Sequence, residues 1–353
     1  MKNKKTIDRR KFLNLAATAL AASSVAMITL PFTAQAEGIN HLNNPAGSTD
    51  TTMGEIKQIN AGVLNIGYAE FGPANGIPVV LLHGWPYDIH SYAQVAPMLA
   101  KQSLRVIVPF LRGNGSTVFL DAKTPRSGEQ AAIGVDLIAL LDALKIDKAV
   151  LTGFDWGARA ACVAAALWPD RCLALVSAGS YLIQDIPKAS EPLAPEKELE
   201  NWYQFYFLTE RGKAGLTRNR NEIARIEWSR LSPLWHFKDE DFSPTTAARE
   251  NPDYVEVVLH SYRHRLGAVP GYPEYEKIQK QLALLPAITV PAITLDGKDD
   301  GYNTPNDGKS SASKFTGFRE HRIIANAGHN LPQENPDAFA QAVIDVLNKS
   351  KYK

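Results

Sequence analysis

The residues best suited to chemistry lie in the stretch LTGFDWGARA, Leu151 to Ala160. Asp155 is at its centre, with Gly153 and Gly157 two residues away on either side, in the layout of a nucleophile elbow that more often holds serine. Glycines leave room for a tight turn between a strand and a helix. A carboxylate at that turn is a nucleophile at neutral pH without losing a proton. The alternative is an aspartate that caps the following helix, a role that does not require glycine on both sides.

The stretch His83-Gly84-Trp85-Pro86 directly follows an apolar run and is a second candidate. A backbone turn here can aim the N–H of Trp85 at the same point as the N–H of Trp156, which would make an oxyanion hole with two donors. Taken alone, the stretch indicates only a turn at the end of a strand. Its position about 70 residues before the elbow favours the oxyanion hole.

A histidine and a group of aspartates follow two later strand-like runs. An ester formed on the nucleophile must be hydrolysed by a water that a histidine deprotonates, while an acid holds the imidazole. His329 lies in a Gly-His loop before the last predicted helix and is our candidate base. For the acid we choose Asp300, because the spacing from Gly297 carries the chain off the strand into the loop facing His329. Asp299 is the alternative, and Asp296 lies at the end of the same strand.

Short apolar runs alternate with helical segments through much of the chain. We predict strands at 55–59, 63–70, 78–82, 106–110, 149–152, 174–177, 292–295 and 322–324, and helices at 134–144, 158–168 and 336–348. The first two strands flank a turn and suggest a hairpin. Strands that alternate with helices predict a parallel α/β sheet.

The stretch from 182 to 283 has a different pattern, Pro-rich at first and then aromatic and helical without a clear strand run. We interpret it as a helical cap inserted into a sheet domain, over the carboxyl edge where open α/β sheets bind ligands. The sheet domain is then predicted in two parts, at 54–181 and 284–353.

The first 36 residues have the pattern of a twin-arginine export signal. Lysines come first, then Arg9 and Arg10 before Phe-Leu, an apolar run, and a small-x-small cleavage site at 34–36. An uncleaved membrane anchor is the alternative, because the apolar run is nearly long enough to span a bilayer. Residues 37–53 are polar and predict a flexible leader. We expect a bacterial protein that is periplasmic or secreted and meets a membrane only through this signal.

Without residues 1–36 the chain carries 32 basic and 36 acidic groups, a net charge of −4, which argues against a nucleic-acid partner. Cys162 and Cys172 are predicted to be buried free thiols, although an exported protein could join them. The sequence contains neither a CxxC motif nor a Cys/His cluster, so we expect no metal and no other cofactor. Nothing in the sequence bears on the oligomeric state.

The motifs together resemble those of soluble epoxide hydrolases, a branch of the α/β-hydrolase fold family, from about Gly54 to the C-terminus. The matching positions are His83–Pro86, Gly153–Gly157, Asp300 and His329. The chain order of nucleophile, acid and histidine is also the one this fold uses. The resemblance implies a mostly parallel central sheet flanked by helices, with the cap inserted after the strand that follows the nucleophile helix. It also implies a small-molecule substrate, an epoxide that is opened to a vicinal diol.

The resemblance further implies two cap tyrosines over the nucleophile. Tyr203 and Tyr262 lie 48 and 107 residues after Asp155, spacings typical of the family. Two phenol O–H donors can bind the oxygen of an opening epoxide and then protonate it. Both tyrosines could instead be ordinary core aromatics. Tyr206, one turn on, is the residue most easily confused with Tyr203.

Two other functions compete with epoxide hydrolysis. A haloalkane or haloacid dehalogenase also uses an aspartate nucleophile and a histidine-activated water, and Trp156 could hold the halide. Haloalkane dehalogenases usually have Asn at the position of Trp85, whereas fluoroacetate dehalogenases have Arg in place of Trp156, although Arg159 remains here. The second alternative is a non-catalytic ligand-binding protein. The presence of a complete set of candidate catalytic residues argues against it.

Overall fold

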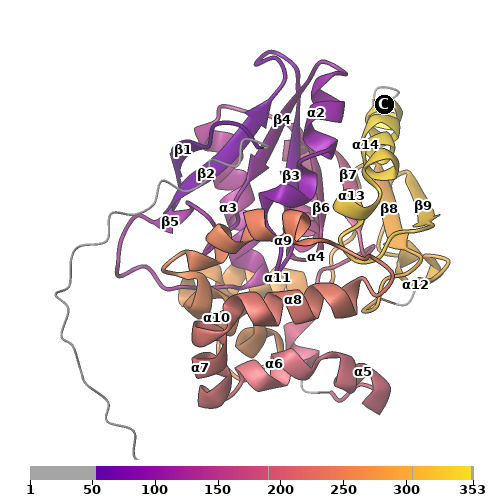
Figure 1. Cartoon of the computed structure of the whole chain (residues 1–353). Coiled ribbons are helices and arrows are strands. Elements are labelled where there is room, and N and C mark those ends of the chain that lie inside the picture. Colours follow the sequence, from indigo (N-terminus) through magenta and orange to yellow (C-terminus); the bar gives the residue numbers. More distant parts are fainter. Residues whose placement is uncertain (1–52, 190, 304, 351–353) are drawn as a thin grey trace, which may run out of the picture. The chain divides into compact units, whose positions relative to one another are not determined.

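One mixed sheet forms the centre of the computed structural model, which describes residues 53–189, 191–303 and 305–350 (Figure 1). Its nine strands follow the order β1-β2-β4-β3-β6-β7-β8-β9, and β5 pairs with β2. The strands are β1 (Lys57–Ala61), β2 (Leu64–Phe71), β3 (Ile77–Leu82), β4 (Leu104–Pro109), β5 (Val118–Phe119), β6 (Ala149–Phe154), β7 (Cys172–Ala178), β8 (Ala292–Gly297) and β9 (Arg319–Ile324).

Helices occupy most of the connections between these strands. They are α2 (Val95–Ala100), α3 (Gln130–Ala143), α4 (Asp155–Leu167), α5 (Pro195–Glu200), α6 (Trp202–Phe207), α7 (Glu210–Arg218), α8 (Arg220–Leu231), α9 (Asp239–Phe242), α10 (Tyr254–Arg265), α11 (Glu276–Ala283), α12 (Lys309–Ala312), α13 (Leu331–Glu334) and α14 (Pro336–Ser350). Short 3₁₀ helices add η1 (Ile89–Tyr92), η2 (Pro169–Arg171), η3 (Ile186–Lys188), η4 (Ser243–Glu250) and η5 (Pro273–Tyr275).

The sheet is mostly parallel, as the alternation of strands and helices predicts. β4, β3, β6, β7, β8 and β9 all pair in parallel. The exceptions involve β2, which is antiparallel to β1, β4 and β5. The pair β1–β2 is the hairpin expected near the start of the domain. Both predictions are therefore confirmed.

Each central strand contributes to two hydrophobic cores because successive side chains point to opposite faces. In β3, Val80 and Leu82 belong to the cluster that includes residues of α3 and α4. Val79 and Leu81 belong to the cluster that includes residues of α2 and α14. All four are at most 1% exposed, and burial of such a side chain stabilises the fold by about 1.5–3 kcal/mol. The carboxyl ends of these strands are thereby held rigidly.

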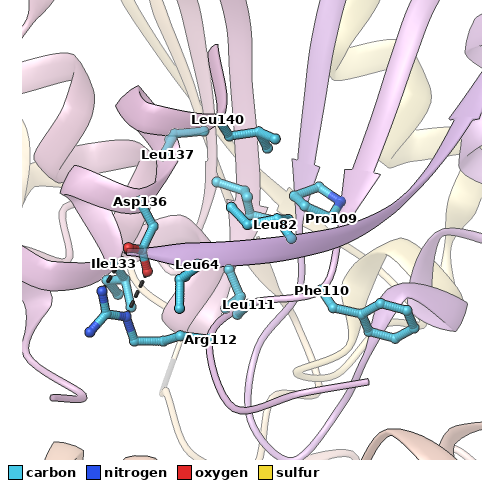
Figure 2. Close-up of a pocket in the computed structure, with 11 residues that line it drawn as sticks. Leu64, Leu82, Pro109, Phe110, Leu111, Arg112, Ile133, Asp136, Leu137 and Leu140 are labelled. Carbon is cyan, nitrogen blue, oxygen red and sulfur yellow. Dashed lines mark hydrogen bonds and ion pairs between the residues drawn. The ribbon is translucent and has the colours of Figure 1, made fainter. Parts of the chain in front are cut away.

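An ion pair between Arg112 and Asp136 fixes the loop after β4 against α3 (Figure 2). Arg112 Nε donates to Asp136 Oδ2 and Nη2 donates to Oδ1, both at 2.6 Å. The guanidinium is 1% exposed, so removing its partner would leave a buried charge at a cost of about 3–5 kcal/mol. The apolar side chains around it include Leu64 and Leu137, which leaves this pair a structural role.

Between β7 and β8 the described chain forms only helices and turns, from η3 to α11. Figure 1 shows α5, α6, α7, α8 and α10 grouped below the sheet. The aromatic rings of Tyr203 on α6 and Tyr262 on α10 contact Trp85, which follows the end of β3. The helices therefore reach the carboxyl edge of the sheet. The domain division at 182 and 283 stays a prediction.

Cys162 on α4 and Cys172 on β7 are free and buried, as predicted. Burial raises the pKa of both thiols, and that of Cys172 reaches about 12. The proposed signal at 1–36 and all but the last residue of the leader at 37–53 lie outside the described residues. Among the described helices, none combines the length and the hydropathy that a membrane span needs.

Candidate active site

Asp155 lies at the point where a strand turns directly into a helix. The sequence predicts a strand that ends at Thr152 and a helix that begins at 158, and these boundaries are wrong by two and three residues. β6 continues to Phe154, and α4 begins at Asp155 itself. A single residue makes the turn, because Asp155 has a left-handed φ of 50°. Such a conformation is uncommon for a residue other than glycine, and it turns the carboxylate out of the strand.

Two glycines are required by close approach to this turn. A Cβ on Gly157 would lie 2.0 Å from the carbonyl oxygen of Leu82 at the end of β3. A Cβ on Gly84 would lie 2.5 Å from the Cβ of Asp155. Neither neighbour can move without breaking the strand or the turn. The small residues of the two motifs therefore serve one purpose, which is to bring the two strand ends together.

The Asp155 carboxylate is the acceptor of the two backbone donors that the sequence singles out. Trp85 N–H donates to Asp155 Oδ1 at 2.8 Å. Burial opposes ionisation, but the nearby imidazole of His329 and hydrogen bonds from the N–H groups of Trp85 and Trp156 hold the pKa of Asp155 below its ordinary value. The carboxylate is therefore charged at neutral pH. The N–H groups of Trp85 and Trp156 could also stabilise an oxyanion formed on an oxygen of this carboxyl group.

His329 lies between two carboxylates. Its Nδ1 is 3.0 Å from Asp300 Oδ2, and its Nε2 is 3.7 Å from Asp155 Oδ2. Burial alone would lower the pKa of His329, but the charges of Asp300 and Asp155 raise it well above its ordinary value. No such contact joins His329 to Asp299 or Asp296 in the described chain, and Asp296 instead approaches His321 at 3.8 Å.

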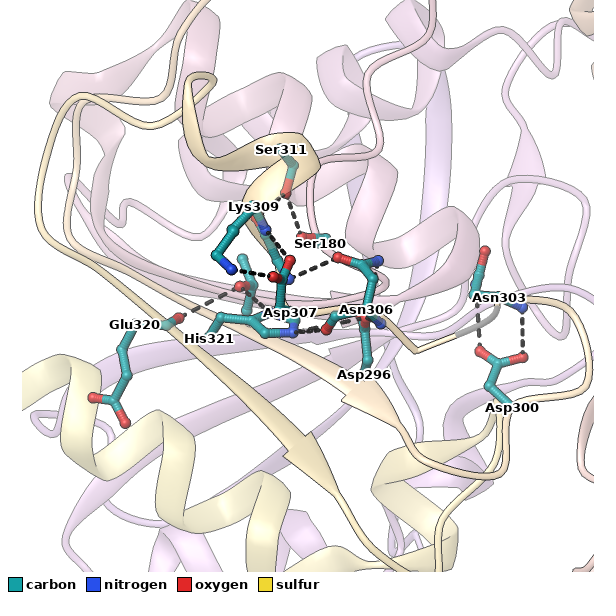
Figure 3. A network of polar contacts seen from close by, with 12 residues as sticks. Ser180, Asp296, Asp300, Asn303, Asn306, Asp307, Lys309, Ser311, Glu320 and His321 are labelled. Atoms are coloured by element: carbon teal, nitrogen blue, oxygen red, sulfur yellow. Dashed lines mark hydrogen bonds and ion pairs between the residues drawn. The ribbon is translucent and has the colours of Figure 1, made fainter.

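The loop after β8 holds Asp300 through its own backbone. Tyr302 N–H and Asn303 N–H donate to Asp300 Oδ1 at 2.8 and 3.0 Å. Figure 3 shows Asn303 beside Asp300 and, farther along the loop, Asn306 against Asp296. With Oδ1 taken by two donors, Oδ2 is left to accept from the imidazole of His329.

The loop that carries His329 is braced by Glu334, which the sequence analysis did not identify. Glu334 accepts hydrogen bonds from Gly328 N–H at 2.7 Å, from Asn330 N–H at 3.0 Å and from the hydroxyl of Ser232 at 2.6 Å. The Ser232 oxygen in turn accepts from His329 N–H at 3.1 Å. The only sign of this role in the sequence is that Glu334 lies five residues after His329. These contacts fix the backbone from which the imidazole projects.

Tyr203 and Tyr262 lie together above the nucleophile turn. Their rings meet edge to face at 5.2 Å, and both contact the indole of Trp85, at 5.1 and 5.3 Å. Burial raises the pKa of each phenol well above its ordinary value, and the charge of Asp155 acts in the same direction. Both hydroxyls therefore keep their protons at neutral pH and can donate.

Tyr206 does not share this position. Its ring stacks on Trp202 at 5.8 Å, and its hydroxyl lies 2.0 Å from where a Cβ on Gly215 would be. Tyr203, in contrast, lines the cavity that contains Asp155 and His329. The structure thus separates the two tyrosines that the sequence leaves easily confused.

A cavity of about 440 Å³, part of it open to solvent, is lined by Asp155, His329, Trp85 and Tyr203, whereas Tyr262, Trp156 and Asp300 are not among its lining residues. Tyr302, Arg159 and Arg265 also line it, although the sequence analysis did not give any of them a role in epoxide opening. The Tyr302 hydroxyl donates to Asn201 Oδ1 at 3.0 Å. Within the described ranges, no group of three or more His, Cys, Asp or Glu is placed to hold a metal ion.

The fold and this site define a class of protein. The chain belongs to the α/β-hydrolase fold family, which matches residues 77–336. It is an epoxide hydrolase-like member, because relatives and solved structures that resemble it carry that name.

Three comparisons show how close these likenesses are. A solved structure from Klebsiella pneumoniae, provisionally named an epoxide hydrolase, is 51% identical and has a TM-score of 0.83, over 84% of this chain and 99% of that one. Epoxide hydrolase 2 of Siraitia grosvenorii is 36% identical over 134 residues, 38% of this chain and 41% of the relative. Haloalkane dehalogenase of Psychrobacter cryohalolentis is 25% identical over 287 residues, 81% of this chain and 88% of the relative.

Proposed function

We propose that this protein hydrolyses epoxides to vicinal diols through an ester on Asp155. The observation that carries the proposal is the difference between the two oxygens of this carboxylate. Oδ1 accepts from Trp85 N–H at 2.8 Å, whereas Oδ2 faces the imidazole of His329 at 3.7 Å. In the proposed mechanism Oδ1 becomes the oxyanion, and Oδ2 attacks the substrate.

In the first step, Asp155 Oδ2 attacks a ring carbon of the epoxide and the carbon–oxygen bond on that carbon breaks. The ring oxygen leaves as an alkoxide, a poor leaving group unless it is protonated. Tyr203 and Tyr262 donate hydrogen bonds to this oxygen, and one of them transfers its proton. The product is a hydroxyalkyl ester of Asp155.

In the second step, His329 removes a proton from a water, and the resulting hydroxide attacks the ester carbonyl. The N–H groups of Trp85 and Trp156 stabilise the oxyanion that forms on Oδ1. Asp300 keeps the imidazole oriented and stabilises its positive charge. Collapse of the intermediate releases the diol, and the proton held by His329 returns to the tyrosine through solvent.

The test is the intact mass of His329→Gln protein after separate incubation with neutral epoxides and with haloalkanes. Without the base, the ester persists, so a mass gain equal to the whole epoxide is expected. The gain must disappear in the Asp155→Asn, His329→Gln double variant. Adducts from neither panel would contradict the proposed chemistry.

Dehalogenation is the second candidate, and the observation in its favour is Trp156. Its indole N–H is buried and has no hydrogen-bond acceptor among the described residues, so it could bind a halide. A mass gain equal to the alkyl group alone, formed only from haloalkanes, would assign this reaction. The two tyrosine hydroxyls favour epoxide opening, because a departing halide needs no proton.

Export to the periplasm or beyond is also a proposal, which rests on the sequence of residues 1–36 alone. The expected outcome is a periplasmic protein that begins at residue 37. Fractionation of expressing cells, with N-terminal sequencing of the product and of an Arg9→Lys, Arg10→Lys variant, tests it.

A further inference from the structure

Two arginines share the catalytic cavity without a carboxylate partner. Arg159 lies on α4 one turn after Asp155, and Arg265 is the last residue of α10. Arg159 Nη1 donates to the carbonyl oxygen of Leu182, and Arg265 Nε donates to Gln184 Oε1 at 3.1 Å. Neither forms an ion pair with a residue in the described part of the chain. The Nε of Arg159 is buried and donates to no described atom.

The electrostatic surroundings of the two guanidinium groups differ. Burial acts to lower the pKa of Arg265, but the neighbouring tyrosines, Tyr302 first, and Asp155 outweigh it and raise that pKa. Burial, and after it the charge of Arg265, lower the pKa of Arg159 to about 10. The fully buried Arg112, in contrast, has a carboxylate partner, since its Nε and Nη2 donate to Asp136. A buried charge without a counterion is costly, and the ordinary remedy is an anion within hydrogen-bond reach.

The charges lining the cavity do not balance. Among the described residues that line it, Asp155 is the one carboxylate, against the two guanidiniums of Arg159 and Arg265. His329 is protonated in the resting protein, but Asp300 offsets its charge, so the wall carries one net positive charge. Esterification of Asp155 removes the negative charge and leaves the two guanidiniums without it. A neutral epoxide would do nothing to offset this change.

We propose that the natural substrate is an epoxide bearing a carboxylate group, which Arg159 and Arg265 bind while Asp155 attacks the ring; this inference rests on the proposed function. A single negative charge matches the net charge of the resting cavity, and the planar carboxylate suits the forked donors of arginine. Arg159 is positioned relative to the nucleophile because both lie on α4. Arg265 also lines an adjoining cavity of about 1040 Å³, part of it open to solvent, so the same guanidinium borders both spaces.

The experiment compares epoxy acids with their amides, which have nearly the same shape but no charge. The probes are 2,3-epoxypropanoate, 3,4-epoxybutanoate and 4,5-epoxypentanoate, each with the matching amide. We expect wild-type kcat/KM to favour at least one acid over its amide by about 10–100-fold, the effect of charge-assisted hydrogen bonds. Arg159→Met and Arg265→Met should each lower this ratio by about 10-fold or more.

Controls separate binding of the carboxylate from damage to the fold. Because Arg159 also holds the carbonyl of Leu182, Arg159→Lys keeps the charge and should restore part of the ratio lost in Arg159→Met. Arg211→Met, an exposed arginine on α7, should leave the ratio unchanged. The inference would be overturned if every variant lost kcat/KM equally for the acid and the amide and Arg159→Lys were no more active than Arg159→Met. That result would mean that the arginines have a purely structural role.

The outcomes also separate this inference from the proposed function. If acids and amides are both opened with a ratio near one, the function stands and the carboxylate site is refuted. If no epoxide forms an ester in His329→Gln, the function fails. In that case calorimetry with butyrate tests the anion site by itself. Butyrate binding to wild type that is lost in Arg159→Met supports the site, and absence of binding to wild type refutes it. Turnover of 2-chlorobutyrate with no epoxy acid opened would likewise support the site while moving the reaction to dehalogenation.

Discussion

The imidazole of His329 approaches the carboxylate of Asp155 at 3.7 Å, a separation longer than a normal hydrogen bond, so their interaction is chiefly electrostatic. The negative charges of Asp300 and Asp155 raise the pKa of His329 well above its ordinary value, against the effect of burial. In the proposed cycle the ester neutralises Asp155, and the pKa of His329 must then fall. Alkylation of the nucleophile therefore releases the base for the second step.

The first prediction is that Asp155→Asn lowers the pKa of His329. An opposite charge at this range shifts a pKa by about 1–3. The measurement is an NMR titration of the histidine ring protons, with His329→Gln used to assign the signal. Asp299→Asn is the matched control and should leave the titration unchanged. An unaltered pKa in Asp155→Asn would refute the release of the base by esterification.

The second prediction concerns stability and pH. Because the pKa of His329 is higher in the folded than in the unfolded protein, its protonated form stabilises the fold. This contribution is fully present below the unfolded pKa of about 6.5 and is lost as the pH rises through the folded pKa. Urea unfolding of wild type and His329→Gln should therefore differ most at acid pH. A difference that grows above neutral pH would have the wrong sign.

The third prediction separates the two chemical steps. Asp300→Asn should slow hydrolysis of the ester by about 10²–10⁴-fold, since the imidazole loses its oriented acceptor. Alkylation does not need a base, so the ester should accumulate during turnover. Quenched-flow mass spectrometry measures both rates. Asp299→Asn, whose side chain makes no contact with His329, serves as the control.

The fourth prediction concerns the alkoxide. Tyr203→Phe and Tyr262→Phe should each slow ester formation by about 10–10³-fold, the loss of one donor to a developing oxyanion. Stopped-flow fluorescence can follow the step, because Trp85 stacks on Tyr203 at 5.1 Å. Tyr206→Phe removes a hydroxyl that points elsewhere and should behave as wild type. Equal effects in all three variants would indicate a packing role.

The fifth prediction concerns Glu334. Replacement by Gln leaves one acceptor oxygen for three donors, so Glu334→Gln should destabilise the protein by about 1–3 kcal/mol. It should also slow ester hydrolysis more than ester formation, because only the histidine loop is loosened. Glu320→Gln on β9 is the control. Unfolding curves and the two rates together check this outcome.

Much of the site could be predicted because its parts are short motifs at strand ends. The Asp155 elbow and the Trp85 turn each occupy consecutive residues, and the parallel sheet brings their strands side by side. His329 follows the same rule after β9. Asp300 could be chosen over Asp299 and Asp296 from its spacing after Gly297 alone.

Other parts of the site depend on packing that local patterns do not encode. Tyr203 and Tyr262 were found by their spacing in a known family, since helical periodicity alone indicated burial. Arg265 and Tyr302 come from the end of a helix and from a loop, and they meet only because of how α10 lies over the sheet. The early start of α4 was missed because one residue, Asp155, makes the whole turn.

The two cysteines have a consequence for the durability of such an enzyme. Epoxides alkylate thiolates, so under the proposed function this protein would be exposed to poisoning by its own substrate. Here both sulfurs are buried and free, and burial raises the pKa of each thiol, so almost no thiolate exists near neutral pH. Asp155, whose pKa is held low, is the charged nucleophile that the cavity presents. In the proposed cycle, alkylation is thus directed to Asp155, from which the second step removes the adduct.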